Sequence, residues 1–451
     1  MLSMKKILSS LCLCLTLVSL SVLSLSCGSR HAVAPAFPVE TAAVVVPLDS
    51  LLPDSVAPTA PEWKPDSLSM EADSLGEPDL PDLPDARPIA ERLRELLDND
   101  IFERTQVGLW VYDLGADTLL FAHHERQCMR PASNMKLVTA ITALHTLGPD
   151  YNFSTELYLD DCRATDSLFS AGVYIKAGYD PLFGEADLLA FVDTLSSRGC
   201  CHLGGDIYAD LSFKDDKRMG WGWCWDDDEV PLTPLLYRNR DSFLTALHSA
   251  LSRAGITWEG TLTERTVPPT ATLVCRRSHP IGEVLVPMMK RSDNSMAEAT
   301  FYQVAHHEAG ERAARKAAVR ATDRLIRQLG LQPDHYQIAD GSGLSLYNYL
   351  TPELLGRMLV YAYHEPAICS LLLPSLPVAA EDGTLRKRMH RTSAAGNVFA
   401  KTGTVEGVST LSGYALTADK RMLAFSIMNQ GIRHTSTGRN FQDRVCRALT
   451  K

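Results

Sequence analysis

The sequence predicts an α/β protein of the α+β type, in which a strand-rich segment is inserted into a larger domain. Two alternating runs, "VGLWVYDL" and "TLLFAHH", flank a short polar turn and predict a β-hairpin. Apolar residues then recur at helical spacing, first after residue 133 and again over residues 298–330. Three strand-like runs close the chain: "NVFAKTGT", "STLSGYALT" and "RMLAFSIMNQ".

Residues 1–27 have a positively charged start, an apolar run and small residues before Cys27, which is the pattern of an export signal peptide. The ending "LSLSC" resembles a bacterial lipoprotein signal, in which the cysteine carries the lipid. Leucine stands two and four positions before Cys27, whereas the usual pattern has it at the third. We expect lipidation of Cys27 and a membrane-anchored protein outside the cytoplasm; simple secretion and a retained anchor helix are the alternatives.

Residues 28–87 are interpreted as a disordered linker. They hold eleven Asp and Glu against three Lys and Arg, together with ten prolines and few aromatic residues. Such a composition does not bury enough apolar surface to order itself. The pattern of apolar runs and of Gly, Asp and Pro changes along the remainder of the chain. It predicts the first part of a main domain at 88–152, an inserted domain at 153–270 and the second part of the main domain at 271–451.

The composition also bears on partners and cofactors. The net charge is -10 and the sequence has no cluster of Lys and Arg, so we expect no nucleic-acid partner. Eight cysteines remain beyond the signal, and outside the cytoplasm we expect some of them to form disulfides. We expect no metal or other cofactor, since no carboxylate or cysteine stands at ligand spacing around the paired histidines His123, His124, His306 and His307.

Three short motifs carry the chemistry. Ser133 and Lys136 stand three residues apart in "RPASNMKLVTAITAL", where a helix beginning at Ser133 places both on one face. Alone, this pair is more typical of a capped helix with a solvated lysine than of a catalytic pair. However, Ser292 and Asn294 follow in "RSDNS", and "KTGT" follows at 401–404. In this order the motifs form the Ser-x-x-Lys, Ser-x-Asn and Lys-Thr-Gly set of penicillin-binding proteins and serine β-lactamases.

The residue types suit acyl transfer. A serine hydroxyl becomes a good nucleophile when a base takes its proton, and Lys136 is such a base only when neutral. From a usual pKa near 10.4, work at neutral pH requires a drop of about 3 units, or roughly 4 kcal/mol. Burial and a second cation lower a lysine pKa, and the apolar helix face and Lys401 are the candidates.

The remaining motif residues have expected roles in binding and proton transfer. We expect Ser292 to relay a proton to the leaving group and Asn294 to hold the substrate amide. The backbone N–H groups of Ser133 and Thr404 would form the oxyanion hole. The glycine of the strand motif would leave space for a substrate backbone along the strand edge. The expected substrate-binding residues are Lys401, Thr402, Gly403 and Thr404.

From about residue 90 onward the chain resembles the class C low-molecular-mass penicillin-binding proteins, which are serine D-alanyl-D-alanine carboxypeptidases and endopeptidases. Blocks such as "GYDPLF", "GWGWCWDDDEVPLTPLLYRN" and "DGSGLSLYNYLTP" look like those of this family and follow its order. Leu346 and Ala380 stand where its pattern has Arg and Gly, and Tyr179 interrupts a Gly-rich run. The resemblance implies the penicillin-binding/β-lactamase-like transpeptidase fold, an antiparallel sheet flanked by helices plus an all-helical part.

The resemblance also implies a function. We expect a periplasmic hydrolase that acts on peptidoglycan stem peptides and cross-links through a Ser133 acyl-enzyme, with β-lactams as covalent inhibitors. Asp226 and Asp227 in a Trp-rich loop, and Asp340 in "DGSG", are candidate substrate contacts. A solvated acidic loop and a structural turn are the alternative interpretations of these carboxylates.

Two other functions compete with this one. A serine β-lactamase is the nearest enzyme, but between Asn294 and Lys401 no Glu is followed four residues later by Asn, as class A enzymes require. A non-catalytic penicillin-sensing or wall-binding protein belongs to a different class. A binding module has no need of both Ser133 and Lys136, so the intact motifs favour the hydrolase.

Overall fold

The computed structural model describes residues 85, 87–165, 168–227, 229–310 and 312–451. All of them belong to one compact unit of the chain. The predicted signal, Cys27 and nearly all of the predicted linker lie outside the described residues. Within the described part, no helix is long and apolar enough to cross a membrane.

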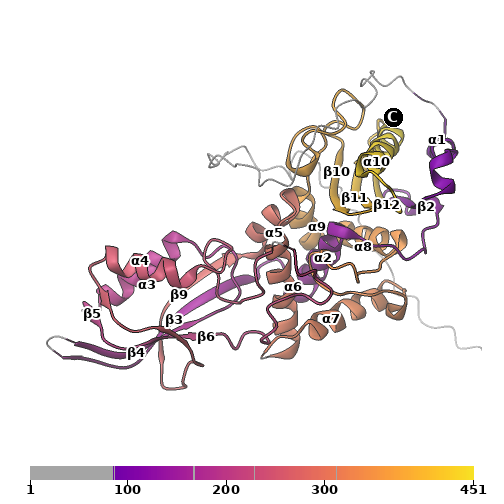
Figure 1. Cartoon of the computed structure of the whole chain (residues 1–451). Helices are drawn as coiled ribbons and strands as arrows, with labels where there is room; N and C mark the ends of the chain where they lie inside the picture. The colour runs from indigo at the N-terminus through magenta and orange to yellow at the C-terminus, as the bar shows by residue number, and fades with distance from the viewer. Residues whose placement is uncertain (1–84, 86, 166–167, 228, 311) are drawn as a thin grey trace, which may run out of the picture. The chain divides into compact units, whose positions relative to one another are not determined.

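A five-stranded antiparallel sheet joins the predicted hairpin to the end of the chain (Figure 1). The strand order is β10-β11-β12-β1-β2, with β1 paired to β12 so that Gln106 lies opposite Gln430. The predicted hairpin and the three predicted strands at the end of the chain are therefore confirmed. The strands are β1 (Gln106–Asp113), β2 (Thr118–His123), β10 (Val398–Val405), β11 (Val408–Leu416) and β12 (Met422–Gln430).

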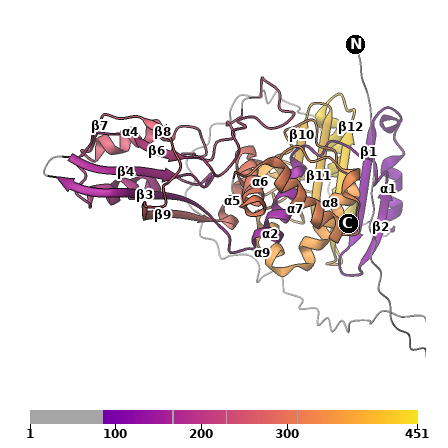
Figure 2. The ribbon, with the colours of Figure 1, turned by 90° about the horizontal axis from the view of Figure 1, so that it is seen from below.

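The two faces of this sheet have separate apolar cores because side chains alternate along each strand. On β1, Leu109 and Val111 pack with α1 (Ile89–Leu97) and α10 (Thr435–Thr450). Trp110, between them, joins the core of the opposite face. Figure 2 shows the sheet between α1 on one side and the larger group of helices on the other.

The larger group of helices surrounds α2, which is buried along residues 135–144. A helix that is apolar all round must lie inside a protein, and α2 packs against α5, α6, α7, α8 and α9. The predicted helical stretch at 298–330 is two helices, separated after Gly310, whose φ is +80°. The group comprises α2 (Met135–Leu147), α5 (Ile281–Lys290), α6 (Asn294–Ala309), α7 (Arg315–Gln328), α8 (Pro352–His364) and α9 (Pro366–Ser375).

A second five-stranded sheet occupies the segment between the first two motifs, in the order β8-β6-β4-β3-β9. The pairs β4–β6 and β6–β8 are parallel, whereas β3 pairs antiparallel with β4 and β9. Because β9 pairs with β3, this sheet extends to residue 280, beyond the predicted boundary at 270. Its strands are β3 (Asn152–Thr165), β4 (Leu168–Lys176), β6 (Ile207–Asp210), β8 (Leu262–Glu264) and β9 (Thr272–Pro280).

The inserted segment also contains two helices that its short apolar runs did not indicate. They are α3 (Glu185–Ser196) and α4 (Phe243–Arg253), which pack with the sheet in a core of their own through Phe191 and Leu247. A short parallel pair, β5 (His202–Leu203) and β7 (Thr257–Trp258), lies beside them. Strand-rich is thus an incomplete description of this segment, because parallel strands need connections that cross over the sheet.

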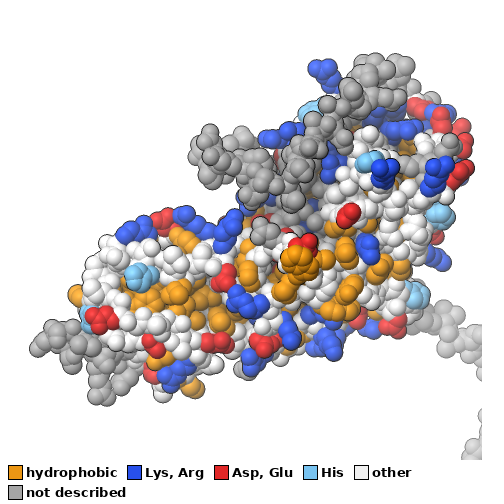
Figure 3. Space-filling model, in the orientation of Figure 1, with side chains coloured by type: hydrophobic (Ala, Val, Ile, Leu, Met, Phe, Trp, Pro, Cys, Tyr) orange, Lys and Arg blue, Asp and Glu red, His pale blue; other side chains and the backbone are white. Residues whose placement is uncertain are grey.

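The described side chains bear on the expected disulfides and on the distribution of charge. The expected disulfides are absent from six described cysteines, which carry free thiols: Cys128, Cys201, Cys224, Cys275, Cys369 and Cys446. On the face drawn in Figure 3, Lys and Arg side chains are interspersed with Asp and Glu. This face therefore presents mixed charge rather than a continuous basic patch.

Candidate active site

Ser133 and Lys136 face each other at the start of α2. Ser133 lies in a single 3-10 turn, η3 (Ala132–Asn134), and α2 begins two residues later at Met135. The helical turns around Ser133 thus begin as a 3-10 turn that continues into α2. The expected pairing is made, because Lys136 Nζ lies 3.0 Å from Ser133 Oγ. Lys136 is completely buried, with a relative exposure of 0%.

The turn that carries Ser133 is held by close backbone packing. Ala132 has a φ of +45°, which is unusual for a residue with a side chain. A Cβ on Gly343 would lie 1.8 Å from the carbonyl oxygen of Ala132, so only glycine fits there. The hydroxyl of Thr410 on β11 donates to the carbonyl of Pro131 at 2.8 Å. Thus the sheet and the loop before α8 fix the nucleophile together.

Gly403 has a different role from the one expected. A Cβ on Gly403 would lie 2.2 Å from Thr410 Oγ1, 2.8 Å from Pro131 O and 3.0 Å from Ser133 N. The missing side chain therefore faces the protein rather than a substrate. Gly403 allows β10 to approach the turn that carries Ser133. This approach is consistent with an oxyanion hole from the N–H groups of Ser133 and Thr404, which stays a prediction.

The second motif joins α6 to both lysines. Ser292 has a φ of +62° and its Oγ lies 2.8 Å from Lys401 Nζ. Asp293 caps α6, since its Oδ1 accepts from the backbone N–H of Met296 at 3.0 Å. Asn294 follows, and its Oδ1 accepts a 2.6 Å hydrogen bond from Lys136. The structure therefore brings Ser133, Lys136, Ser292, Asn294 and Lys401 into one cluster.

The electrostatic setting of Lys136 differs in one respect from the expectation. Burial lowers the pKa of Lys136 to about 8, as a lysine base requires. The charges that act on it oppose this shift, because they are the carboxylates of Asp340, Glu298, Asp293 and Glu229. Lys401, the cation expected to assist, is itself buried, and its own pKa is held well below its usual range by burial and by Lys136. Desolvation therefore dominates.

The strand motif presents its residues at different depths. Lys401 is buried and donates to Thr402 O at 2.7 Å, and Thr402 Oγ1 donates to Thr384 Oγ1 at 2.8 Å. Thr404 is exposed. Of the expected carboxylate-binding residues, Thr404 is thus the most exposed, and Thr402 is half-buried.

Asp340 is a structural residue and not a substrate contact. It is buried, and its carboxylate accepts hydrogen bonds from the backbone N–H groups of Gly343 at 2.8 Å and Ser345 at 2.7 Å. Asn348 Nδ2 at 2.7 Å and Trp223 Nε1 at 2.9 Å also donate to it. These bonds occupy both carboxylate oxygens, so the turn interpretation is the correct one.

The two candidate aspartates of the Trp-rich loop (residues 220–230) lie differently. Asp227 is half-buried and its Oδ2 accepts from the backbone N–H of Cys224 at 2.6 Å, so it stabilises its own turn. Asp226 is exposed. Its contact with a substrate stays a prediction.

Sequence reasoning missed two carboxylates at this site. Glu298 is buried on α6, accepts from the backbone N–H groups of Gly341 and Ser342, and has its pKa raised by burial. Its position four residues after Asn294, on the same helix face, was a usable signal. Glu229 accepts a hydrogen bond from Asn294 Nδ2. It follows a run of aspartates, and nothing in that run distinguishes it.

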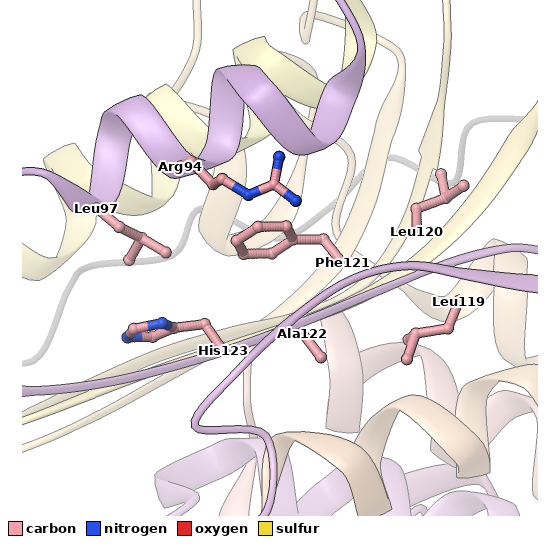
Figure 4. A pocket seen from close by; sticks show the side chains of 7 residues that line it. All are labelled: Arg94, Leu97, Leu119, Leu120, Phe121, Ala122 and His123. Carbon is pink, nitrogen blue, oxygen red and sulfur yellow. The ribbon is translucent and has the colours of Figure 1, made fainter.

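A separate pocket lies far from these residues along the sheet. Figure 4 shows it between α1 and β2, with Arg94 above the ring of Phe121. It is lined by α1 and β2 residues such as Leu97 and Leu119. Since β2 and β10 are the opposite edges of the sheet, this pocket is not part of the site around Ser133. Among the described residues, no group of His, Cys, Asp and Glu could hold a metal ion.

A serine beside a buried lysine of lowered pKa, on a helix packed against an antiparallel sheet, defines a serine acyl-transfer enzyme of the penicillin-binding type. The chain belongs to the D-Ala-D-Ala carboxypeptidase 3 (S13) family, whose model matches residues 89–236 and 236–451. It is therefore a serine-type peptidase, and the expected family is confirmed.

Individual relatives agree with this assignment. The D-alanyl-D-alanine carboxypeptidase of Actinomadura sp. (strain R39) is 27% identical, over 78% of this chain and 83% of its own. The crystal structure of penicillin-binding protein 4 from Haemophilus influenzae is 20% identical with a TM-score of 0.71, over 80% of this chain and 99% of that one. A predatory endopeptidase from Bdellovibrio bacteriovorus is 16% identical with a TM-score of 0.51, over 75% and 89%. The expected fold class is confirmed by these two structures.

Proposed function

We propose that this protein is a D-alanyl-D-alanine carboxypeptidase that also cleaves peptidoglycan cross-links, works in the periplasm and is held at a membrane by a lipid on Cys27. The observation that carries the peptidase is the 3.0 Å approach of Lys136 Nζ to Ser133 Oγ, together with the pKa of about 8 that burial gives Lys136. The name of the Actinomadura relative supports the substrate class.

The reaction follows from the geometry. Neutral Lys136 takes the proton of Ser133 while Oγ bonds to the substrate carbonyl carbon, and the carbonyl oxygen becomes an oxyanion. The oxyanion is stabilised by backbone N–H groups beside Ser133. The peptide C–N bond then breaks as the proton held by Lys136 is returned to the leaving amine, with Ser292, whose Oγ lies 2.8 Å from Lys401 Nζ, as the expected relay. Water attacks the resulting ester, releases the acid and restores Ser133 and Lys136.

Digestion of defined peptidoglycan fragments tests this proposal. Purified protein is given pentapeptide monomers and cross-linked dimers, and free D-alanine and dimer loss are followed by chromatography. We expect release of D-alanine by the wild type and none by Ser133→Ala. Dimer loss would support the endopeptidase activity named for the Bdellovibrio neighbour.

The same assay separates the competing functions. A penicillin should acylate Ser133 and leave slowly, as the name of the Haemophilus protein suggests. Rapid turnover of penicillin with no action on peptides would favour a β-lactamase. Stable acylation with no peptide turnover would favour a penicillin sensor.

The anchor has its own test. The proposal rests on Cys27 at the end of the apolar run in residues 1–27. We expect the wild type in the membrane fraction and Cys27→Ser in the soluble fraction. Equal distribution of the two would contradict lipid anchoring and favour secretion or a retained helix.

A further inference from the structure

The inserted segment supplies a side chain to the catalytic cluster. Glu229 in the Trp-rich loop accepts a hydrogen bond from Asn294 Nδ2. Asn294 Oδ1, the other end of the same amide, accepts from Lys136 at 2.6 Å. A continuous chain of contacts therefore runs from Glu229 through Asn294 and Lys136 to Ser133.

The contacts of Lys136 show why the direction of that amide matters. Its Nζ has three polar neighbours: Asn294 Oδ1 at 2.6 Å, Ser342 O at 2.8 Å and Ser133 Oγ at 3.0 Å. A neutral amine has two N–H donors and one lone pair. The amide and carbonyl oxygens accept only, so they take the two N–H groups. The lone pair is then left for the hydroxyl proton of Ser133, as the reaction requires.

A reversed amide would undo this arrangement. If Asn294 turned its NH2 group to Lys136, the lone pair of the neutral amine would accept from that group and no longer face Ser133. A carboxylate offers acceptors only, and therefore favours the orientation in which Nδ2 points to Glu229 and Oδ1 to Lys136. Nδ2 carries two hydrogens, so one remains available for a substrate carbonyl.

We infer that Glu229 is a positioning residue of the active site: it holds the Asn294 amide so that Lys136 directs its lone pair at Ser133 Oγ. This inference rests on the proposed function and deepens it. Glu229 belongs to the inserted segment. That segment therefore helps to orient the catalytic base Lys136. Glu229 acts through Asn294 and is not itself placed on the reacting atoms.

The charges around the chain give the inference a readout in pH. Removing Glu229 removes one carboxylate that raises the pKa of Lys136, so the lysine becomes neutral at lower pH. Burial raises the pKa of Glu229, and Lys136, Asp293 and Asp227 are the charged groups that act on it. The groups that act on Lys136 besides Glu229 are Asp340, Glu298 and Asp293, and Lys401 lies in the same cluster.

The test is the pH profile of the second-order rate constant for acylation by a fluorescent penicillin, with D-alanine release measured in parallel. Glu229→Gln keeps the size of the side chain but adds a donor, so both amide orientations become available. Glu229→Leu removes the acceptor altogether. We expect the plateau value of the acylation rate constant to fall severalfold in Glu229→Gln and by about tenfold in Glu229→Leu. In both variants the rise of the rate constant on the acid side of the profile should move to lower pH. The matched control is Asp216→Asn, which removes an exposed carboxylate from the same inserted segment.

The outcomes are distinct. Profiles of both Glu229 variants that match the wild type would overturn the inference. A lower plateau with an unmoved acid limb would also overturn it, because a packing defect alone would produce that result. Failure of the wild type to be acylated would instead refute the proposed function. Thermal unfolding of Glu229→Gln and Asp216→Asn, measured alongside, shows whether the variants are folded.

Discussion

The indole Nε1 of Trp223 donates a 2.9 Å hydrogen bond to Asp340 Oδ2, and this bond links the inserted segment to the turn before α8. That turn also supplies the carbonyl of Ser342 to Lys136 at 2.8 Å. The Trp-rich loop is therefore attached at Asp340 through Trp223, at Asn294 through Glu229 and at Ser345 through the carbonyl of Trp221. Asn294 contacts Lys136 directly, and Asp340 lies two residues before Ser342, whose carbonyl contacts the same lysine.

Asp340→Asn should destabilise the protein without a specific effect on substrate affinity. The carboxylate accepts bonds from five groups, and an amide nitrogen in place of one oxygen leaves buried donors unpaired. We expect a loss of about 1–3 kcal/mol in the free energy of unfolding, measured with denaturant. Asp226→Asn, at an exposed position, should change it by less than about 0.5 kcal/mol. An unchanged stability of Asp340→Asn, with a raised KM, would restore the role of substrate contact.

The rate of acylation should depend on the protonation of Lys136. Burial places the pKa of Lys136 at about 8, below its usual 10.5, so the neutral base is scarce below that pH and abundant above it. We expect kcat/KM to rise about tenfold per pH unit below the pKa and to level off above it. Lys136→Arg, which stays protonated, should lose at least about 100-fold. A flat profile between about pH 6 and about pH 9 would exclude Lys136 as the base.

Gly403→Ala should impair the nucleophile through the backbone. Its Cβ would lie 2.8 Å from Pro131 O and 3.0 Å from Ser133 N, so β10 or the turn of Ser133 must move. We expect a fall in penicillin acylation of at least about 100-fold, since small displacements of reacting groups cost that much. Gly205→Ala is the control, because a Cβ there meets nothing within 4 Å and its φ is not in the left-handed region. Normal acylation of Gly403→Ala would show that the close approach is unimportant.

Thr404→Val should weaken the recognition of a terminal carboxylate. Thr404 is exposed at the end of β10, whereas Thr402 Oγ1 already donates to Thr384. A lost hydrogen bond to a charged group should lower kcat/KM about tenfold on a stem peptide with a free carboxyl end. The same peptide with an amidated end should be cleaved equally by wild type and variant. If both peptides lose activity in parallel, Thr404 serves the oxyanion hole or the fold instead.

Several parts of the site were predictable from sequence because they are local or chemically distinctive. Ser133 and Lys136 are separated by less than one helical turn, so their proximity follows from helix geometry. The strands β10, β11 and β12 follow one another and pair in order, as alternating runs with short connections do. The motif set itself names the chemistry of acyl transfer.

The remaining features depended on which distant segments the fold packs together. In the sequence, nothing distinguishes Glu229 from the neighbouring acidic residues. Its contact with Asn294 exists only because the Trp-rich loop packs against the start of α6. The sequence suggested that Gly403 leaves space for a substrate. In the structure, the close approach of Ser133 N and Pro131 O explains why this position has no side chain. The low pKa of Lys136 arises from complete burial. The sequence by itself thus determined the reactive groups and their order, whereas burial and long-range contacts, which local spacing does not encode, decided how those groups are held and charged.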